Sequence, residues 1–300
     1  MSSLLVALIG AGSMAAHHAR IISRCAGASL AIVVDRDRDR AARLADQWGA
    51  ASAATMSAVL DCDAAVIATS TPSHSDTALQ LISAGLPILV EKPLTSSLAE
   101  TREVLDAAQA NDVALMCGFV ERFNPAFLRL AADVGSAISH ISTVRIGPAP
   151  QRTHSTVVDD VLIHDLDLVC RLTPGDTVTT IRSEALGECD SRGWPETVTC
   201  SLTMASGITA NLRACRDSPT RQRDVSITQP DAREHIASLL SPAGNPLAAQ
   251  FEHFCWLVQH GSKAERHRER AGVLPSHEIA DLIEQQLARA RAELRATCPP

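Results

Sequence analysis

Tyrosine is absent from this 300-residue sequence, and lysine is nearly so: Lys92 and Lys263 are the two lysines among 27 basic residues. The first absence excludes tyrosine as an acid–base group. The second draws attention to Lys92, because a desolvated ammonium can lose its proton whereas a guanidinium cannot. The nine cysteines contain no Cys-x-x-Cys pair, which argues against a disulfide framework and fits reduced thiols in the cytoplasm.

A net positive charge is also absent, and long apolar runs are scarce. The net charge of -7 offers no basic footprint for nucleic acid or for an anionic membrane. The apolar run Leu4–Ile9 is too short to cross a bilayer, and no Lys or Arg precedes it as in a secretory signal. We therefore expect a cytoplasmic protein whose partner is a small molecule, with neither nucleic acid nor membrane as a partner.

The first 35 residues follow the order of a dinucleotide-binding βαβ unit. Leu4–Ile9 has the continuous apolar character of a buried parallel strand. Gly10–Ala15 then supplies G-x-G-x-x-A at the start of a helical stretch, and Leu30–Val34 predicts a second strand that ends at Asp35. Such a glycine motif is specific only in this context, with an acid after the second strand. The alternative is a glycine-rich turn without a ligand.

Each part of this unit suits a dinucleotide. The glycines allow a tight turn and close approach of the pyrophosphate, whose charge the helix N-terminus stabilises. Asp35 favours NAD by accepting from the ribose hydroxyls, while Arg36 keeps NADP open because it could bind a 2′-phosphate. The predicted cofactor contacts from this unit are Gly10, Gly12, Ser13, Met14, Asp35 and Arg36.

Strands and helices continue to alternate up to Gly118. Strands are expected at Ala64–Ala68, at Pro87–Val90 and at Val113–Cys117, with helices between them. This alternation predicts a doubly wound parallel sheet with right-handed crossovers. The loop after the strand at 64–68 adds Thr69, Ser70 and His74 as predicted cofactor contacts, although His74 suits a loop-bracing role equally well. Ser75 is the expected cap of the following helix.

The turn Glu91-Lys92-Pro93 directly follows a buried strand. Proline stops the strand because it has no N–H and its φ is fixed. Glu91 and Lys92 are therefore expected at the carboxyl end of the sheet, where open α/β sheets bind ligands. We predict that both contact the cofactor and that Lys92 also takes part in the chemistry. The competing interpretation is a surface turn with a chance charge pair.

The second part of the chain changes character, so we expect a Rossmann domain over residues 1–119 and a second, substrate-binding and oligomerisation domain over 120–300, with C-terminal helices that could pack back on the Rossmann domain. Alternating apolar and polar residues predict one-sided antiparallel strands, followed by two helices. The expected strands are 141–146, 178–186, 198–205, 208–216 and 225–228, and the helices are 247–260 and 276–295, with Ser276 as N-cap. Residues 265–270 are expected to form a charged, solvated loop.

The segment 159–172 contains a narrow polar stripe on an otherwise apolar helix. Asp160, His164, Asp167 and Arg171 are spaced to share one helix face, which indicates a helix beside a cleft. Two alternatives compete with this interpretation. The stripe could be solvated, with Asp167 and Arg171 as an ordinary i,i+4 pair, or it could bind a metal. No cysteine or second histidine lies at ligand spacing nearby, so no metal is expected.

The glycine loop, Asp35, Glu91-Lys92-Pro93 and Asp160-x-x-x-His164 together resemble the Gfo/Idh/MocA family of NAD(P)-dependent oxidoreductases. The resemblance covers essentially the whole chain. It implies an α/β fold: a Rossmann domain followed by a C-terminal α/β domain with an open, mainly antiparallel sheet. It also implies that Lys92, Asp160 and His164 form the catalytic set. Family members commonly pair through the open sheet, so we expect a homodimer or homotetramer.

Within that family, residues 121–125, 145–148 and 160–172 are similar to the branch that includes UDP-N-acetylglucosamine 3-dehydrogenases. The predicted substrate contacts are Arg122, Asn124, Arg145, Arg152 and Asp167. Arginine forks suit phosphate oxygens, and Arg213 and Arg216 are further candidates. For any single arginine, however, plain surface charge is the simpler interpretation.

The expected activity is NAD-dependent oxidation of a secondary hydroxyl to a ketone, on a nucleotide sugar or a nucleoside phosphate. His164 is expected to act as general base with Asp160 orienting it, and Lys92 to stabilise charge on the oxygen. The roles of Lys92 and His164 could be exchanged. Three alternatives remain open: an NAD-dependent glycosidase, a reductase of keto-sugars or pigments, and a cofactor-binding regulator without turnover.

Overall fold

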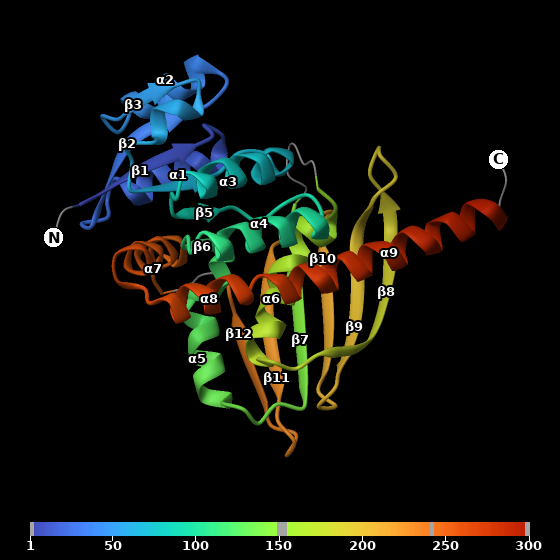
Figure 1. Ribbon diagram of the computed structural model, residues 1–300. Coiled ribbons are helices and arrows are strands. Elements are labelled where there is room, and N and C mark those ends of the chain that lie inside the picture. The colour runs from blue at the N-terminus through green and yellow to red at the C-terminus, as the bar shows by residue number, and fades with distance from the viewer. Residues whose placement is uncertain (1–2, 149–154, 241–242, 298–300) are drawn as a thin grey trace. The chain divides into compact units, whose positions relative to one another are not determined.

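The computed structural model describes residues 3–148, 155–240 and 243–297 (Figure 1). The chain divides into two compact units. Unit 1 contains Met1–Val120 and Asn245–Leu274, and unit 2 contains Glu121–Gly244 and Pro275–Pro300. The first boundary lies next to the one expected from the sequence, and residues 245–274 return to unit 1. Each unit has one six-stranded sheet, and each is described by itself below.

Unit 1 is built on a parallel sheet with the strand order β3-β2-β1-β4-β5-β6. This is the order of a doubly wound dinucleotide-binding sheet, in which the strand order reverses between β1 and β4. The strands are β1 (Leu4–Ile9), β2 (Ala28–Val34), β3 (Ala51–Ala53), β4 (Ala64–Ile67), β5 (Ile88–Val90) and β6 (Leu115–Cys117). All residues of the central strands β4 and β5 are buried, which explains their continuous apolar sequence.

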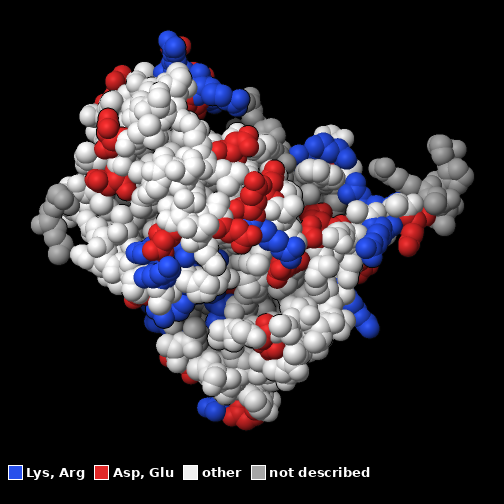
Figure 2. Space-filling model, viewed as in Figure 1, with Lys and Arg blue, Asp and Glu red and all other residues white. Residues whose placement is uncertain are grey.

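In the described part of unit 1, the helices that accompany this sheet are α1 (Ser13–Ile22), α2 (Arg38–Asp46), α3 (His74–Ser83), α4 (Leu98–Ala110), α7 (Pro246–His260) and α8 (Lys263–Ala271). Helix α7 packs against α1, and α8 packs against β6 and α4. On the face seen in Figure 2, basic and acidic side chains are interspersed, with a group of arginines over α2. Short 3₁₀ turns lie at Met56–Val59 and Thr71–Ser73.

Two local predictions in unit 1 are wrong. Residues 265–270 belong to helix α8, which begins with a capping box: Ser262 and Glu265 each accept from the other's backbone N–H. A capping box stabilises a helix start whose sequence has little apolar periodicity. The N-cap of α3 is Ser73 without a side-chain cap bond, whereas Ser75 is buried inside the helix.

Unit 2 contains a mostly antiparallel sheet with the order β12-β11-β7-β10-β9-β8, in which β7 and β10 are parallel. The strands are β7 (His140–Ile146), β8 (Val178–Cys189), β9 (Pro195–Met204), β10 (Thr209–Cys215), β11 (Gln222–Thr228) and β12 (Glu234–Ser238). The helical elements are a 3₁₀ turn at Val120–Phe123, α5 (Pro125–Val134), a π-helical turn at Val158–Leu162, α6 (Ile163–Leu172) and α9 (Leu274–Thr297). The fold class expected from the sequence is thus confirmed in both units.

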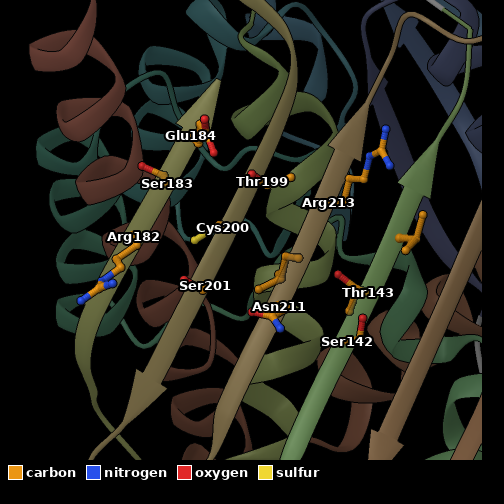
Figure 3. A pocket seen from close by; sticks show the side chains of 12 residues that line it. Ser142, Thr143, Arg182, Ser183, Glu184, Thr199, Cys200, Ser201, Asn211 and Arg213 are labelled. Atoms are coloured by element: carbon orange, nitrogen blue, oxygen red, sulfur yellow. The ribbon is translucent and has the colours of Figure 1, made fainter. Parts of the chain in front are cut away.

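Alternate residues of the unit 2 strands point to opposite faces of the sheet. One set, which includes Ile141 and Leu212, packs with residues of α5, α6 and α9 in a single apolar core. The other face is polar and is hollowed over β7 to β10 by a groove of about 630 Å³ (Figure 3). Its lining includes Ser142, Ser201 and Asn211.

Two further predictions in unit 2 need correction. The segment 159–172 is not one regular helix, because a π-helical turn precedes α6. Helix α9 begins at Leu274, two residues before Ser276, so Ser276 is not its N-cap but a fully buried residue. Across the described residues, no helix combines the length and the apolar character needed to cross a membrane.

Candidate active site

The glycine loop of unit 1 has the shape that a pyrophosphate site requires. Gly10 has φ +105°, and a Cβ at Gly10 would lie 2.6 Å from the carbonyl oxygen of Ala68, so only glycine fits there. A Cβ at Gly12, in contrast, meets nothing within 4 Å. Helix α1 begins at Ser13, has no side-chain cap bond and carries no acidic residue in its first turn.

This loop fits NAD on three counts. The space over Gly12 is open, and the first N–H groups of α1 are not capped by a side chain. Met14 is 39% exposed, and Ser13 is exposed beside it. A phosphate at this helix end would therefore meet backbone donors and the positive end of the helix dipole.

Asp35 lies at the carboxyl end of β2, beside the glycine loop. Its Oδ2 accepts the backbone N–H of Ala11 at 2.8 Å. Its Oδ1 accepts the backbone N–H of Asp37 at 2.8 Å and one N–H of Arg40 at 3.2 Å. The carboxylate is thus oriented by the loop and by α2, and Oδ2, which accepts one hydrogen bond, keeps acceptor capacity for a ribose hydroxyl. Arg36 is exposed.

The loop after β4 contains the remaining predicted cofactor residues of unit 1. Thr69 is half-buried and Ser70 is exposed. His74 is 1% exposed, with Nδ1 at 3.0 Å from the carbonyl oxygen of Pro93 and Nε2 at 3.2 Å from that of Thr69. Burial lowers the pKa of His74 despite these acceptors. The geometry favours the bracing role for this histidine.

Glu91 and Lys92 follow β5 at the same edge of the sheet. Glu91 is 8% exposed, and its Oε1 lies 2.6 Å from Nε2 of His18 on α1. Its Oε2 accepts the backbone N–H of Lys92 at 3.2 Å, and Lys92 itself is half-buried. Burial alone would raise the pKa of Glu91, but the hydrogen bond and charge of His18 and the charge of Lys92 hold it below its ordinary value.

In unit 2, the predicted catalytic residues lie where the π-helical turn meets α6. Asp160 belongs to the turn and His164 is the second residue of α6, and both are half-buried. Single π-helical turns occur frequently at functional sites. Asp160 Oδ2 lies 3.8 Å from Arg216, a guanidinium that also donates to Glu196 at 2.6 Å.

Asp167, the third polar residue of the stripe, pairs with Arg122 and not with Arg171, the partner considered from the sequence. Asp167 is 1% exposed and accepts two hydrogen bonds from Arg122, at 2.8 and 2.5 Å. Arg171 is exposed. The alternative of a solvated Asp167–Arg171 pair is therefore wrong. Along the stripe, Asp160 and His164 are half-buried, Asp167 lies in a buried ion pair, and Arg171 is exposed to solvent.

Arg145 lies in a second buried ion cluster of unit 2. Its guanidinium donates to Asp165 at 3.0 and 2.7 Å and to Glu121 at 2.9 Å. Burial alone would lower the pKa of Arg145, but the two carboxylates raise it above its ordinary value. Asn124 donates to Glu121 at 2.8 Å and caps α5 through the N–H of Ala126.

The predicted substrate residues thus differ in their surroundings. Arg122, Arg145 and Asp167 hold buried charge pairs, and whether they also contact a substrate stays a prediction. Arg152 lies outside the described residues. Arg213 is exposed at the groove on the open face of the sheet.

Sequence reasoning missed the partners that hold these groups in place. His18, Glu121 and Asp165 are each at most 4% exposed and each pairs with a predicted site residue. A charged or titratable residue at an apolar helix position is a usable signal, since burial demands a partner. His18 lies at such a position on α1, and Asp165 on α6.

Comparisons with known proteins agree with this architecture. Residues 4–119 match the GFO_IDH_MocA oxidoreductase family, described by its NAD-binding Rossmann fold. A UDP-N-acetylglucosamine 3-dehydrogenase from Acidithiobacillus ferrooxidans is 30% identical over 218 residues, which are 72% of this chain and 68% of that protein. The myo-inositol dehydrogenase Hyg17 from Streptomyces leeuwenhoekii is 29% identical over 231 residues, 72% of this chain and 71% of that protein.

Among solved structures, GenD2 from gentamicin A biosynthesis, in complex with NAD, has a TM-score of 0.84 at 20% identity. The match covers 94% of each chain, which extends the likeness in fold to unit 2. The chain therefore belongs to the Gfo/Idh/MocA family of NAD-binding oxidoreductases and is a dehydrogenase that acts on CH–OH groups.

Proposed function

We propose that the enzyme oxidises a secondary hydroxyl of a sugar ring to a ketone, with the 3-hydroxyl of UDP-N-acetylglucosamine as the first candidate. The observation that carries the proposal is the placement of Lys92. One of two lysines in the chain, it follows β5 at the carboxyl edge of a dinucleotide-binding sheet, and Glu91 fixes its backbone. Ligands of open α/β sheets bind at this edge.

The proposed roles follow from the charges that develop during the reaction. NAD, when bound at the glycine loop, supplies the acceptor for the hydride. The hydroxyl proton must leave at the same time, and we assign its removal to His164, with Asp160 as the carboxylate that orients the imidazole. Lys92 stabilises negative charge on the reacting oxygen or relays the proton.

The residues proposed to hold NAD are those predicted from the sequence. Gly10, Gly12, Ser13 and Met14 form the loop and first helical turn for the pyrophosphate, and Asp35 faces the same loop. Thr69 and Ser70, at the end of β4, belong to the same carboxyl edge. Because Arg36 could bind a 2′-phosphate, NADP is kept as the alternative to NAD.

The nucleotide half of the substrate has less support than the ring hydroxyl. Arg145, one of the arginines predicted to bind phosphate, and Arg122, another predicted substrate contact, are engaged by carboxylates. A relative that is a myo-inositol dehydrogenase matches the chain about as well as the nucleotide-sugar enzyme does. We therefore keep myo-inositol, an uncharged cyclic polyol, as the second candidate.

Formation of NADH at 340 nm tests the proposal directly. Purified enzyme is mixed with NAD and either UDP-N-acetylglucosamine or myo-inositol, and the products are identified by mass spectrometry. A ketone two mass units lighter than the substrate, formed in step with NADH, supports the proposal. Release of free sugar without net NADH would point instead to an NAD-dependent glycosidase. No NADH with either compound would contradict both candidates.

We further propose that two copies pair through the open face of the unit 2 sheet, in a homodimer or within a homotetramer. The face carries the hydroxyl-lined groove of Figure 3 and exposed charges of both signs, Arg182 and Glu184, on the edge strand β8. Light scattering should give at least twice the chain mass of 31.9 kDa. An Arg182→Glu variant should weaken pairing, and a monomeric wild type would contradict the proposal.

A cytoplasmic location is proposed on the state of the cysteines. The eight cysteines of the described residues are all free thiols, as is usual in a reducing compartment. Cell fractionation with an activity assay tests this proposal.

A further inference from the structure

Two buried histidines flank the turn that contains Lys92. His18, from α1, is fully buried and contacts Glu91, the residue before Lys92, at 2.6 Å. His74, from α3, is 1% exposed and lies 3.0 Å from the carbonyl oxygen of Pro93, the residue after Lys92. The residues on both sides of the lysine are therefore held by side chains from separate helices.

Glu91 passes the constraint from His18 to the lysine. One carboxylate oxygen meets His18, and the other accepts the backbone N–H of Lys92 at 3.2 Å. Glu91 also packs closely against Gly118. A Cβ placed on Gly118 would lie 2.9 Å from Oε2 and 3.0 Å from the Cα of Glu91. The carboxylate therefore has little room to move, and its two oxygens connect α1 to the Lys92 backbone.

Packing alone does not explain a histidine at position 18. The side chain is fully buried, and its Nδ1 has no hydrogen-bond partner among the described residues. A buried polar atom without a partner costs free energy, which an apolar side chain of similar size would avoid. The contact of Nε2 with Glu91 is what distinguishes histidine from leucine here.

We propose that His18 is a positioning residue: through Glu91 it fixes the Lys92 backbone, and so the place where the ammonium meets the substrate. His74 acts on the other side of the turn through Pro93. The proposal rests on the proposed function, because it takes Lys92 to be catalytic. Neither histidine needs to touch the substrate for this role.

Lysine NMR offers a readout that needs neither substrate nor cofactor. Because the chain has only Lys92 and Lys263, protein labelled with ¹³C-lysine gives two side-chain signals, assigned with a Lys92→Arg variant. We expect His18→Gln to shift or split the Lys92 signal and to leave that of Lys263, on α8, unchanged. His17→Gln is the matched control, since His17 is the exposed neighbour on the same helix, and it should change neither signal.

Kinetics supply the second readout, with UDP-N-acetylglucosamine or myo-inositol as the probe. His18→Gln should lower kcat by about 10- to 100-fold, the size expected for a misplaced catalytic group. The dissociation constant of NAD, measured by calorimetry, should stay within about twofold, because the glycine loop is untouched. Glu91→Gln is the second variant: an amide has one acceptor oxygen for two partners, so the Lys92 signal and kcat should change in the same direction.

An unchanged Lys92 signal with unchanged kcat in folded His18→Gln or Glu91→Gln would overturn the positioning role. So would a parallel loss of NAD binding and thermal stability, since that pattern marks a purely structural residue. Lys92→Ala separates this outcome from failure of the proposed function. If Lys92→Ala loses turnover while His18→Gln does not, only the positioning role fails; if Lys92→Ala keeps turnover, the proposed function fails, while the NMR result still stands.

Discussion

The two units treat their predicted site residues in opposite ways. In unit 1, eight of the eleven predicted cofactor residues are exposed or half-buried, and of the buried ones Glu91 is held by His18 and His74 lies against two backbone carbonyl oxygens. In unit 2, the predicted substrate residues Arg122, Arg145 and Asp167 form buried ion pairs. Backbone motifs therefore led mainly to accessible positions, whose contact with NAD stays a prediction, whereas the choice of charged residues by type also selected internal charge pairs of unit 2.

Removal of Arg145 should give the largest loss of stability, because it would leave Asp165 and Glu121 buried without their shared counter-charge. An Arg145→Leu variant should lose about 3–5 kcal/mol, as is typical when one partner of a buried pair is removed. Urea unfolding followed by circular dichroism measures the change. The exposed Arg129→Leu, on α5, is the control and should stay within about 0.5 kcal/mol of wild type. Equal stability of both variants would mean that the unit 2 cluster is not structural.

Alanine substitutions at Gly10 and Gly12 should have different effects: the first on the stability of the loop conformation, the second on NAD binding. Gly10→Ala meets both a positive φ and the carbonyl oxygen of Ala68, so it should lose about 1–3 kcal/mol of stability. Gly12→Ala meets open space and should fold normally but bind NAD more weakly, because its methyl group lies where the pyrophosphate approaches. Thermal unfolding and calorimetry with NAD check the two halves. Normal NAD binding by Gly12→Ala would contradict the assignment of the loop.

His74 should give the smallest effect, visible as a trend with pH. Its pKa in the folded chain is lowered from the ordinary value of 6.5. As the pH falls below about 6.5, the unfolded chain therefore takes up a proton that the folded chain does not, and stability is lost until the lowered pKa is passed. The stability advantage of wild type over His74→Asn should shrink between pH 7.5 and 5.5. An advantage that grows on acidification would mean that His74 is charged in the folded state.

The sequence was sufficient for most strands of both sheets, because strand alternation and the glycine loop are local patterns, but it did not predict the edge strands β3 and β12. It failed where the pattern was weak or the partner distant. Helix α8 has few apolar residues, and only its capping box at Ser262 and Glu265 marks its start. The pairing of Arg145 with Asp165 depends on how β7 packs against α6, and no local pattern states that register.

If Lys92 and His164 serve the same hydride transfer, as we propose, the turnover of Lys92→Met, His164→Ala and the double variant with NAD should show it. Each single variant should lose at least about 100-fold in kcat while still binding NAD. The kcat of the double variant should be only slightly lower than that of the slower single variant, as for residues that act as a unit. A single variant with near-normal turnover would contradict the claim.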